Sequence, residues 1–69
     1  MSGIEQRTFQ VRDDWTLHIK SRPGKIGNRV GFYVWIEGKR FWVRGTDRRE
    51  AEGIAGFRYI TNMPVEDND

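Results

Sequence analysis

The sequence predicts an α+β domain in which a small antiparallel β-sheet of three to four strands packs on one C-terminal helix. Two observations carry this prediction. Short runs of alternating apolar and polar residues fill the first two thirds of the chain, and a helix start signal follows residue 45. Because the strands precede a single helix, we expect the helix to cover one face of the sheet.

Size limits the chain to a single domain. A protein of 69 residues buries only ~60% of the surface that its unfolded chain exposes. Although 32% of the residues are charged, nine aromatic residues, three of them Trp, supply apolar area that a disordered chain lacks. We expect a frayed N-terminus over residues 1–6, the folded domain over residues 7–60, and an acidic C-terminal tail over residues 61–69.

Composition also favours a cytoplasmic protein. The chain has no cysteine, which is typical of a reducing compartment. No apolar run approaches the ~18 residues of a membrane span, and the first residues lack the apolar core of a signal peptide.

The N-terminal part contains two alternating segments, residues 8–12 and residues 15–20, separated by Asp13-Asp14. Asp is common in turns and depleted in strands, so we favour a hairpin over a single long strand with a bulge. In the second segment Trp15, Leu17 and Ile19 share one face. Two glycines and a proline then predict a loop over residues 21–28.

Residues 30–45 predict a second hairpin with its turn at Glu37-Gly38. A two-residue turn places these pairs opposite each other on one face: Ile36 with Lys39, Val34 with Phe41, and Phe32 with Val43. The other face then holds Tyr33, Trp35, Arg40, Trp42 and Arg44. A three-residue turn would instead exchange the faces of Trp42 and Phe41, so the two faces depend on the register.

The helix is predicted to begin at about residue 47. Asp47 can cap its first turn, and Glu50 can reach back to the same turn. An apolar stripe at helical spacing contains Ala51, Ile54, Ala55 and Phe57. Because Arg58 would interrupt this stripe, we expect the helix to end near Phe57. Gly53 and Gly56 are expected either to allow a close approach to the sheet or to end the helix early.

The residues needed for catalysis are scarce. The chain offers no thiol nucleophile, and its single histidine, His18, has no partner that would form a catalytic triad and is expected to be a surface residue. One histidine with scattered carboxylates does not supply a zinc site, and phosphate-binding glycine patterns are absent. We therefore expect a protein that is not an enzyme, with no cofactor and no metal.

The charge pattern favours a polyanionic partner. Nine basic residues between Lys20 and Arg49 face only two acidic ones. The rings and arginines of the hairpin face are suited to stacking on bases and pairing with phosphates. The alternative is that Trp35 and Trp42 cover a second core layer under the N-terminal segment.

Four further cations are expected to flank the same surface. Arg48 and Arg49 occupy the first helical turn, where the macrodipole disfavours positive charge, so a phosphate partner would explain their placement. Pairing of Arg48 with Glu52 is the alternative. Lys25 in the predicted loop and Lys39 beside the hairpin turn complete the set.

Three short motifs follow one another in the second half of the chain: Gly38-Lys39-Arg40-Phe41-Trp42-Val43, then Gly45-Thr46-Asp47, then a helix opening Arg49-Glu50-Ala51-Glu52. In this order they resemble the ethylene-response-factor DNA-binding domain and its phage relatives, the arm-binding domains of tyrosine recombinases. The resemblance covers about 30 residues. It implies a three-stranded sheet whose outer face enters the major groove, with Trp35, Arg40, Trp42 and Arg44 contacting bases and phosphates. This chain departs from the family in its helix glycines, its longer N-terminal segment and the lack of a following catalytic domain.

These observations favour a small accessory or regulatory nucleic-acid-binding protein. Duplex DNA is the favoured partner: the hairpin face docks on it, Arg40 and Arg44 contact base edges, and the cations of the loop, turn and helix neutralise phosphates. A variant is single-strand binding by stacking on Tyr33, Trp35 and Trp42. The alternative is a protein-binding module, such as a small phage-type inhibitor of a host enzyme, that uses the same face. A structural role or a weak homodimer through this face is a third hypothesis.

Overall fold

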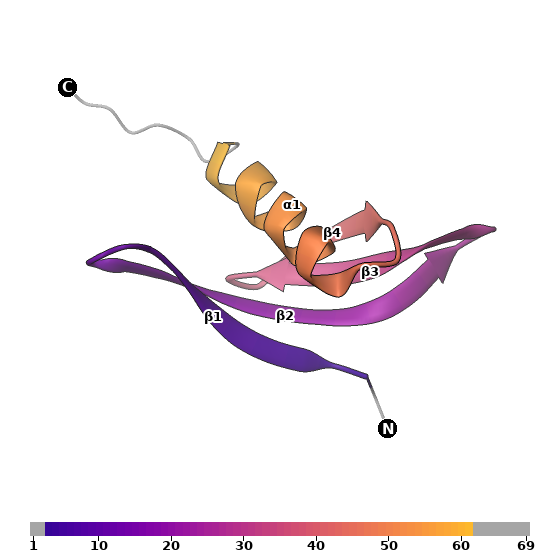
Figure 1. Ribbon diagram of the computed structural model, residues 1–69, viewed down its shortest axis with the longest axis horizontal. Coiled ribbons are helices and arrows are strands. Elements are labelled where there is room, and N and C mark those ends of the chain that lie inside the picture. Colours follow the sequence, from indigo (N-terminus) through magenta and orange to yellow (C-terminus); the bar gives the residue numbers. More distant parts are fainter. Residues whose placement is uncertain (1–2, 62–69) are drawn as a thin grey trace.

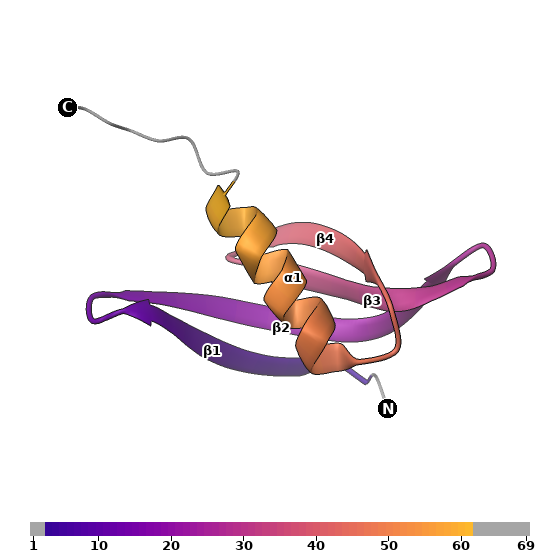
Figure 2. The same cartoon turned by 45° about the horizontal axis from the view of Figure 1, so that its top comes forward.

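A computed structural model describes residues 3–61, which form a four-stranded antiparallel sheet and one helix (Figure 1). The elements are β1 (Glu5–Arg12), β2 (Trp15–Ile26), β3 (Arg29–Ile36), β4 (Lys39–Arg44) and α1 (Arg48–Thr61). The strands lie in chain order, and α1 crosses one face of the sheet (Figure 2). The predicted fold class is confirmed. Within the described residues, no helix is long and apolar enough to cross a membrane.

The turn between β3 and β4 contains two residues, as predicted. Glu37 and Gly38 have φ values of 52° and 86°, and positive φ at both central positions is what a type I′ turn requires. The register therefore matches the predicted pairs, with Ile36 opposite Lys39 and Phe32 opposite Val43. A three-residue turn is excluded.

The N-terminal segment forms a hairpin with β2. Asp13 and Asp14 make the turn, and the register shifts between Gln10 and Arg12 because β1 carries one extra residue there. The hairpin interpretation is thus confirmed, although a bulge is present as well.

The ends of the domain differ from the expected ones. β1 begins at Glu5, which pairs with Ser21, so residues 5 and 6 belong to the sheet and not to a frayed N-terminus. Thr61 is part of α1. The remainder of the predicted acidic tail, residues 62–69, lies outside the described residues.

The prediction of a loop over residues 21–28 is wrong, because β2 continues to Ile26 and only Gly27-Asn28 form the turn. Pro23 is tolerated in this strand for a positional reason. The Glu37 N–H donates to the His18 carbonyl at 3.0 Å, and alternation along the ladder directs the Pro23 nitrogen away from β3. β1 does not extend along this part of β2, so the missing N–H removes no bond between strands.

The core lies between the sheet and α1. Alternate positions of β2, β3 and β4 point toward the helix, as the period of two predicts. The buried apolar side chains are Leu17, Ile19, Phe32, Val34, Ile36, Val43, Ala51 and Ala55. The small alanines allow α1 to lie close to the sheet.

The helix departs from prediction at its C-terminal end. α1 continues to Thr61 because buried Ala51 and Ala55 are followed at helical spacing by half-buried Tyr59, a stripe that leaves Arg58 outside. Phe57 was expected in the stripe but is 68% exposed.

The two helix glycines have neither of the expected roles. A methyl group added to Gly53 or Gly56 would meet no atom within 4 Å, and the helix passes through both positions. They border a groove of about 690 Å³ between α1 and β1.

Candidate nucleic-acid interface

The sheet has one face toward α1 and one face, here called the outer face, on which no described element packs (Figures 1 and 2). Paired residues on the outer face form rows across the strands. One row is Gln6, Lys20, Trp35 and Arg40, the next is Arg22, Tyr33 and Trp42, and the third is Gly24, Gly31 and Arg44. Five predicted site residues, Tyr33, Trp35, Arg40, Trp42 and Arg44, therefore lie together as the alternation predicted.

The rings of the outer face have cations of β2 and β4 beside them. Tyr33 and Trp35 project from β3 and Trp42 from β4, and we call them the three rings. The four flanking cations are Lys20 and Arg22 on β2, and Arg40 and Arg44 on β4. No outer-face position of the four strands carries Asp or Glu.

The cations lie against the rings. The Arg22 guanidinium carbon is 4.9 Å from the Tyr33 ring centroid and 5.9 Å from that of Trp35. Arg40 lies 5.7 Å from Tyr33, and the Lys20 Nζ lies 5.7 Å from Trp35. These distances are within the ~6 Å range of cation–π attraction. The contacts hold the charges beside the rings, where a stacked anionic ligand would meet both.

Glycines support two of the rings from below. A Cβ atom at Gly24 would lie 2.4 Å from the Tyr33 ring, and one at Gly31 would lie 2.5 Å from the Trp42 indole. The Trp42 Nε1–H also donates to the Gly24 carbonyl at 3.3 Å. Tyr33 and Trp42 thus lie along the sheet over backbone that carries no side chain.

The alternative of a second core layer under the N-terminal segment is wrong. β1 pairs edge to edge with β2 and does not cover the three rings. Trp35 and Trp42 are half-buried by neighbours within the sheet.

Sequence reasoning missed Lys20 and Arg22 as members of this surface. The strand period puts Lys20 on the face opposite Trp15, Leu17 and Ile19, and Arg22 falls in the segment predicted as a loop. The signal was present, since the alternation that starts at Trp15 continues through Ser21 and Arg22. Proline and glycine predict a loop over residues 21–28, because the open edge of β2 that accommodates Pro23 is not visible from the sequence.

Lys25 and Lys39 do not flank the outer face. Lys25 pairs with Val30, and Lys39 pairs with Ile36, which puts both on the side of the sheet that faces α1. The Lys39 Nζ lies 6.0 Å from the Phe41 ring. Both lysines are close in sequence to the site residues, which is why they were expected to flank the outer face. The strand period of two instead puts them on the opposite face of the sheet.

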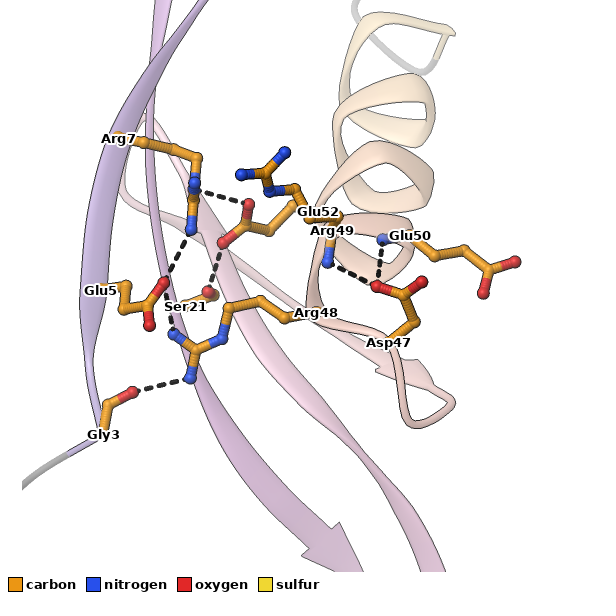
Figure 3. A network of polar contacts seen from close by, with 9 residues as sticks. All are labelled: Gly3, Glu5, Arg7, Ser21, Asp47, Arg48, Arg49, Glu50 and Glu52. Carbon is orange, nitrogen blue, oxygen red and sulfur yellow. Dashed lines mark hydrogen bonds and ion pairs between the residues drawn. The ribbon is translucent and has the colours of Figure 1, made fainter.

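Arg48 and Arg49 also lie on the helix side, at the start of α1 (Figure 3). Asp47 caps this helix, as predicted, and its Oδ1 accepts from the Arg49 N–H at 3.1 Å. Arg48 binds Glu5 at 3.0 Å and donates to the Gly3 carbonyl at 2.8 Å. Its side chain is only 18% exposed. Arg48 therefore holds β1 to the helix.

Glu52 takes part in the same network, but not as the partner of Arg48 (Figure 3). The Arg7 Nε lies 2.8 Å from Glu52, and the Ser21 hydroxyl donates to the same carboxylate. Glu52 and Ser21 are buried. This contact joins β1, β2 and α1 on the side of the sheet that faces the helix.

A hollow of about 640 Å³ borders the outer face beside Trp35. Gln6, Thr8, Lys20 and Glu37 contribute to its lining. Glu37 accepts the His18 backbone N–H at 2.8 Å and lies 3.0 Å from the His18 Nδ1. The backbone hydrogen bond, followed by the ring contact, lowers the pKa of Glu37 below 4.5. His18 is exposed, as expected, but has this partner.

Among residues 3–61, no group of three or more His, Asp or Glu side chains could hold a metal ion. No protein-family model matches the chain, and searches of curated proteins and of solved structures gave no match. The resemblance to ethylene-response-factor domains stays a prediction, carried by the motifs of the second hairpin and the helix start.

Proposed function

We propose that this protein binds DNA through the outer face of its sheet. One observation carries the proposal: three rings lie between four flanking cations, and no outer-face strand position bears a carboxylate. Cations of this kind neutralise phosphates, and the rings supply planar surfaces for bases or sugars. The contacts are noncovalent and need no cofactor.

Salt dependence tests the ionic part of the proposal. Four phosphate contacts predict that the affinity falls about 50-fold for a single strand, or about 150-fold for a duplex, between about 50 mM and about 200 mM salt. Titration with single-stranded and duplex oligonucleotides, followed by tryptophan fluorescence, measures this change.

A charge-matched pair of variants locates the contact. Arg40→Gln should weaken binding about 5-fold at about 100 mM salt and lower the salt slope by nearly one. Arg58→Gln removes the same charge from the exposed side of α1 and should leave the affinity unchanged. Equal losses in both variants, or no DNA binding at low salt, would contradict the proposal.

A protein partner at the same face is the competing function, because Trp, Tyr and Arg also dominate protein interfaces. The absence of aliphatic side chains from the rows that hold the rings favours DNA. If neither DNA form binds, the protein-partner hypothesis replaces ours.

A further inference from the structure

The orientation of the three rings determines which part of each ring a ligand can contact. Tyr33 and Trp42 lie along the sheet over Gly24 and Gly31, and cations are placed over Tyr33 and Trp35. Tyr33 and Trp42 therefore turn part of a ring face, and not only a ring edge, away from the sheet. A face stacks on the face of a base, and bases inside a duplex are already stacked on each other and expose only their edges in the grooves.

The width of the sheet also disfavours a duplex groove. The row through Trp35 crosses all four strands, from Gln6 on β1 to Arg40 on β4. At about 4.8 Å between strands, this row is ~14 Å wide before side chains are counted. The major groove is about 12 Å wide and admits a helix or a two-stranded ribbon. At this row the sheet is too broad to lie flat in the major groove.

The rings and cations also define a path. Tyr33 and Trp35 follow each other along β3, with ring centroids 6.2 Å apart and planes tilted by 33°. Cations of β2 and β4 lie on either side, and the hollow beside Trp35 lies at one end. Its amide, hydroxyl and carboxylate groups, from Gln6, Thr8 and Glu37, are suited to hydrogen bonding with a base edge.

From these observations, and resting on the proposed function, we infer that the ligand is single-stranded DNA. Its unstacked bases lie on the three rings, and its phosphates contact the four flanking cations. DNA is favoured over RNA because two rows, that of Arg22, Tyr33 and Trp42 and that of Gly24, Gly31 and Arg44, offer few partners for a 2′-hydroxyl. Their side chains are cations and rings, and the Tyr33 hydroxyl is the one neutral oxygen among them.

The first test compares three ligands of one mixed sequence, about 10 nucleotides long, which is within the ~4–16 nucleotides covered by small single-strand-binding domains. These are single-stranded DNA, the same DNA as a duplex, and single-stranded RNA. We expect the single-stranded DNA to bind at least about 10-fold more tightly than the duplex, and no less tightly than the RNA. Duplex binding that is equal or tighter overturns the inference while leaving the proposed function intact, and tighter RNA binding overturns the choice of DNA. Absence of all binding contradicts the proposed function itself.

The second test uses variants of one ring. Trp35→Leu should weaken single-strand binding by between about 5-fold and about 150-fold, the range found when a stacking ring is removed. Trp35→Phe keeps a ring and should retain most of the affinity. Phe57→Leu removes an exposed ring from α1, on the other side of the molecule, and should have no effect. Equal affinity of Trp35→Leu and the wild type, with folding checked by circular dichroism, would overturn the stacking model.

Discussion

At the scale of the residue, Gly31 has the most demanding environment on the outer face. A Cβ atom there would lie 2.4 Å from the Val43 carbonyl oxygen and 2.5 Å from the Trp42 indole. The carbonyl belongs to the backbone of β4 and cannot rotate away. Gly24 differs, because only the Tyr33 side chain would be in the way.

We therefore predict that Gly31→Ala lowers the free energy of unfolding by about 1–3 kcal/mol, the usual cost of forcing an extra carbon into a packed site. Gly24→Ala should cost less, since the Tyr33 ring can move, but should weaken DNA binding by displacing that ring. Urea unfolding of both variants beside the wild type checks the order. A smaller loss for Gly31→Ala than for Gly24→Ala would contradict it.

Glu37 links stability to pH. Its pKa is lowered because the charged carboxylate accepts the His18 backbone N–H, so the folded state favours ionisation. The contribution is present above the unfolded pKa near 4.5 and is lost as the pH falls through the lower folded value. We predict that Glu37→Gln is less stable than the wild type at pH 7, and that the difference shrinks below about pH 4. Thermal unfolding at both pH values measures this; a difference that stays constant would refute the assignment.

At the scale of the element, α1 is held by its cap and by packing more than by its own composition. Gly53 is exposed, and nothing lies within 4 Å of the position of a methyl group there. Glycine costs a helix interior up to about 1 kcal/mol relative to alanine.

Gly53→Ala is therefore predicted to raise the free energy of unfolding by about 0.5–1 kcal/mol without changing DNA affinity. Denaturant unfolding and the oligonucleotide titration together test this statement. Loss of stability would mean that the groove between α1 and β1 closes on this position.

At the scale of the whole molecule, a small polar network joins the first strand of the chain to the first turns of its helix. Arg48 ties the start of α1 to Glu5, and Glu52 ties the next turn to Arg7 and Ser21 (Figure 3). β1 has little apolar packing of its own, since Phe9 is 51% exposed. Through Arg48 and Glu52 this network holds β1 to the helix.

Removal of the Glu52 carboxylate leaves the buried Ser21 hydroxyl without its acceptor. We predict that Glu52→Ala lowers the free energy of unfolding by about 1–3 kcal/mol. Amide hydrogen exchange should quicken in β1 more than in β3, because β1 loses its link to α1. Uniform acceleration across the sheet would show that Glu52 supports the whole core instead.

Local patterns in the sequence predicted the second hairpin and the cap of the helix. With a two-residue turn they also placed Trp42 and Phe41 on opposite faces of the sheet, and the structure excluded the three-residue alternative. A two-residue turn and a period of two are properties of neighbouring residues, so they can be derived without knowing the rest of the chain. Only the tertiary structure decided the extent of β2 past Pro23, the partners of Arg48 and the inclusion of Lys20 and Arg22 in the surface. Each of these depends on residues far apart in sequence. The extent of β2 depends on where its pairing with β1 stops, the partners of Arg48 depend on the position of Glu5, and the surface depends on the rings that cover Gly24 and Gly31. Local patterns thus predict the rings of the outer face and the cations Arg40 and Arg44. The other two cations, Lys20 and Arg22, join the surface only because β2 pairs with β3.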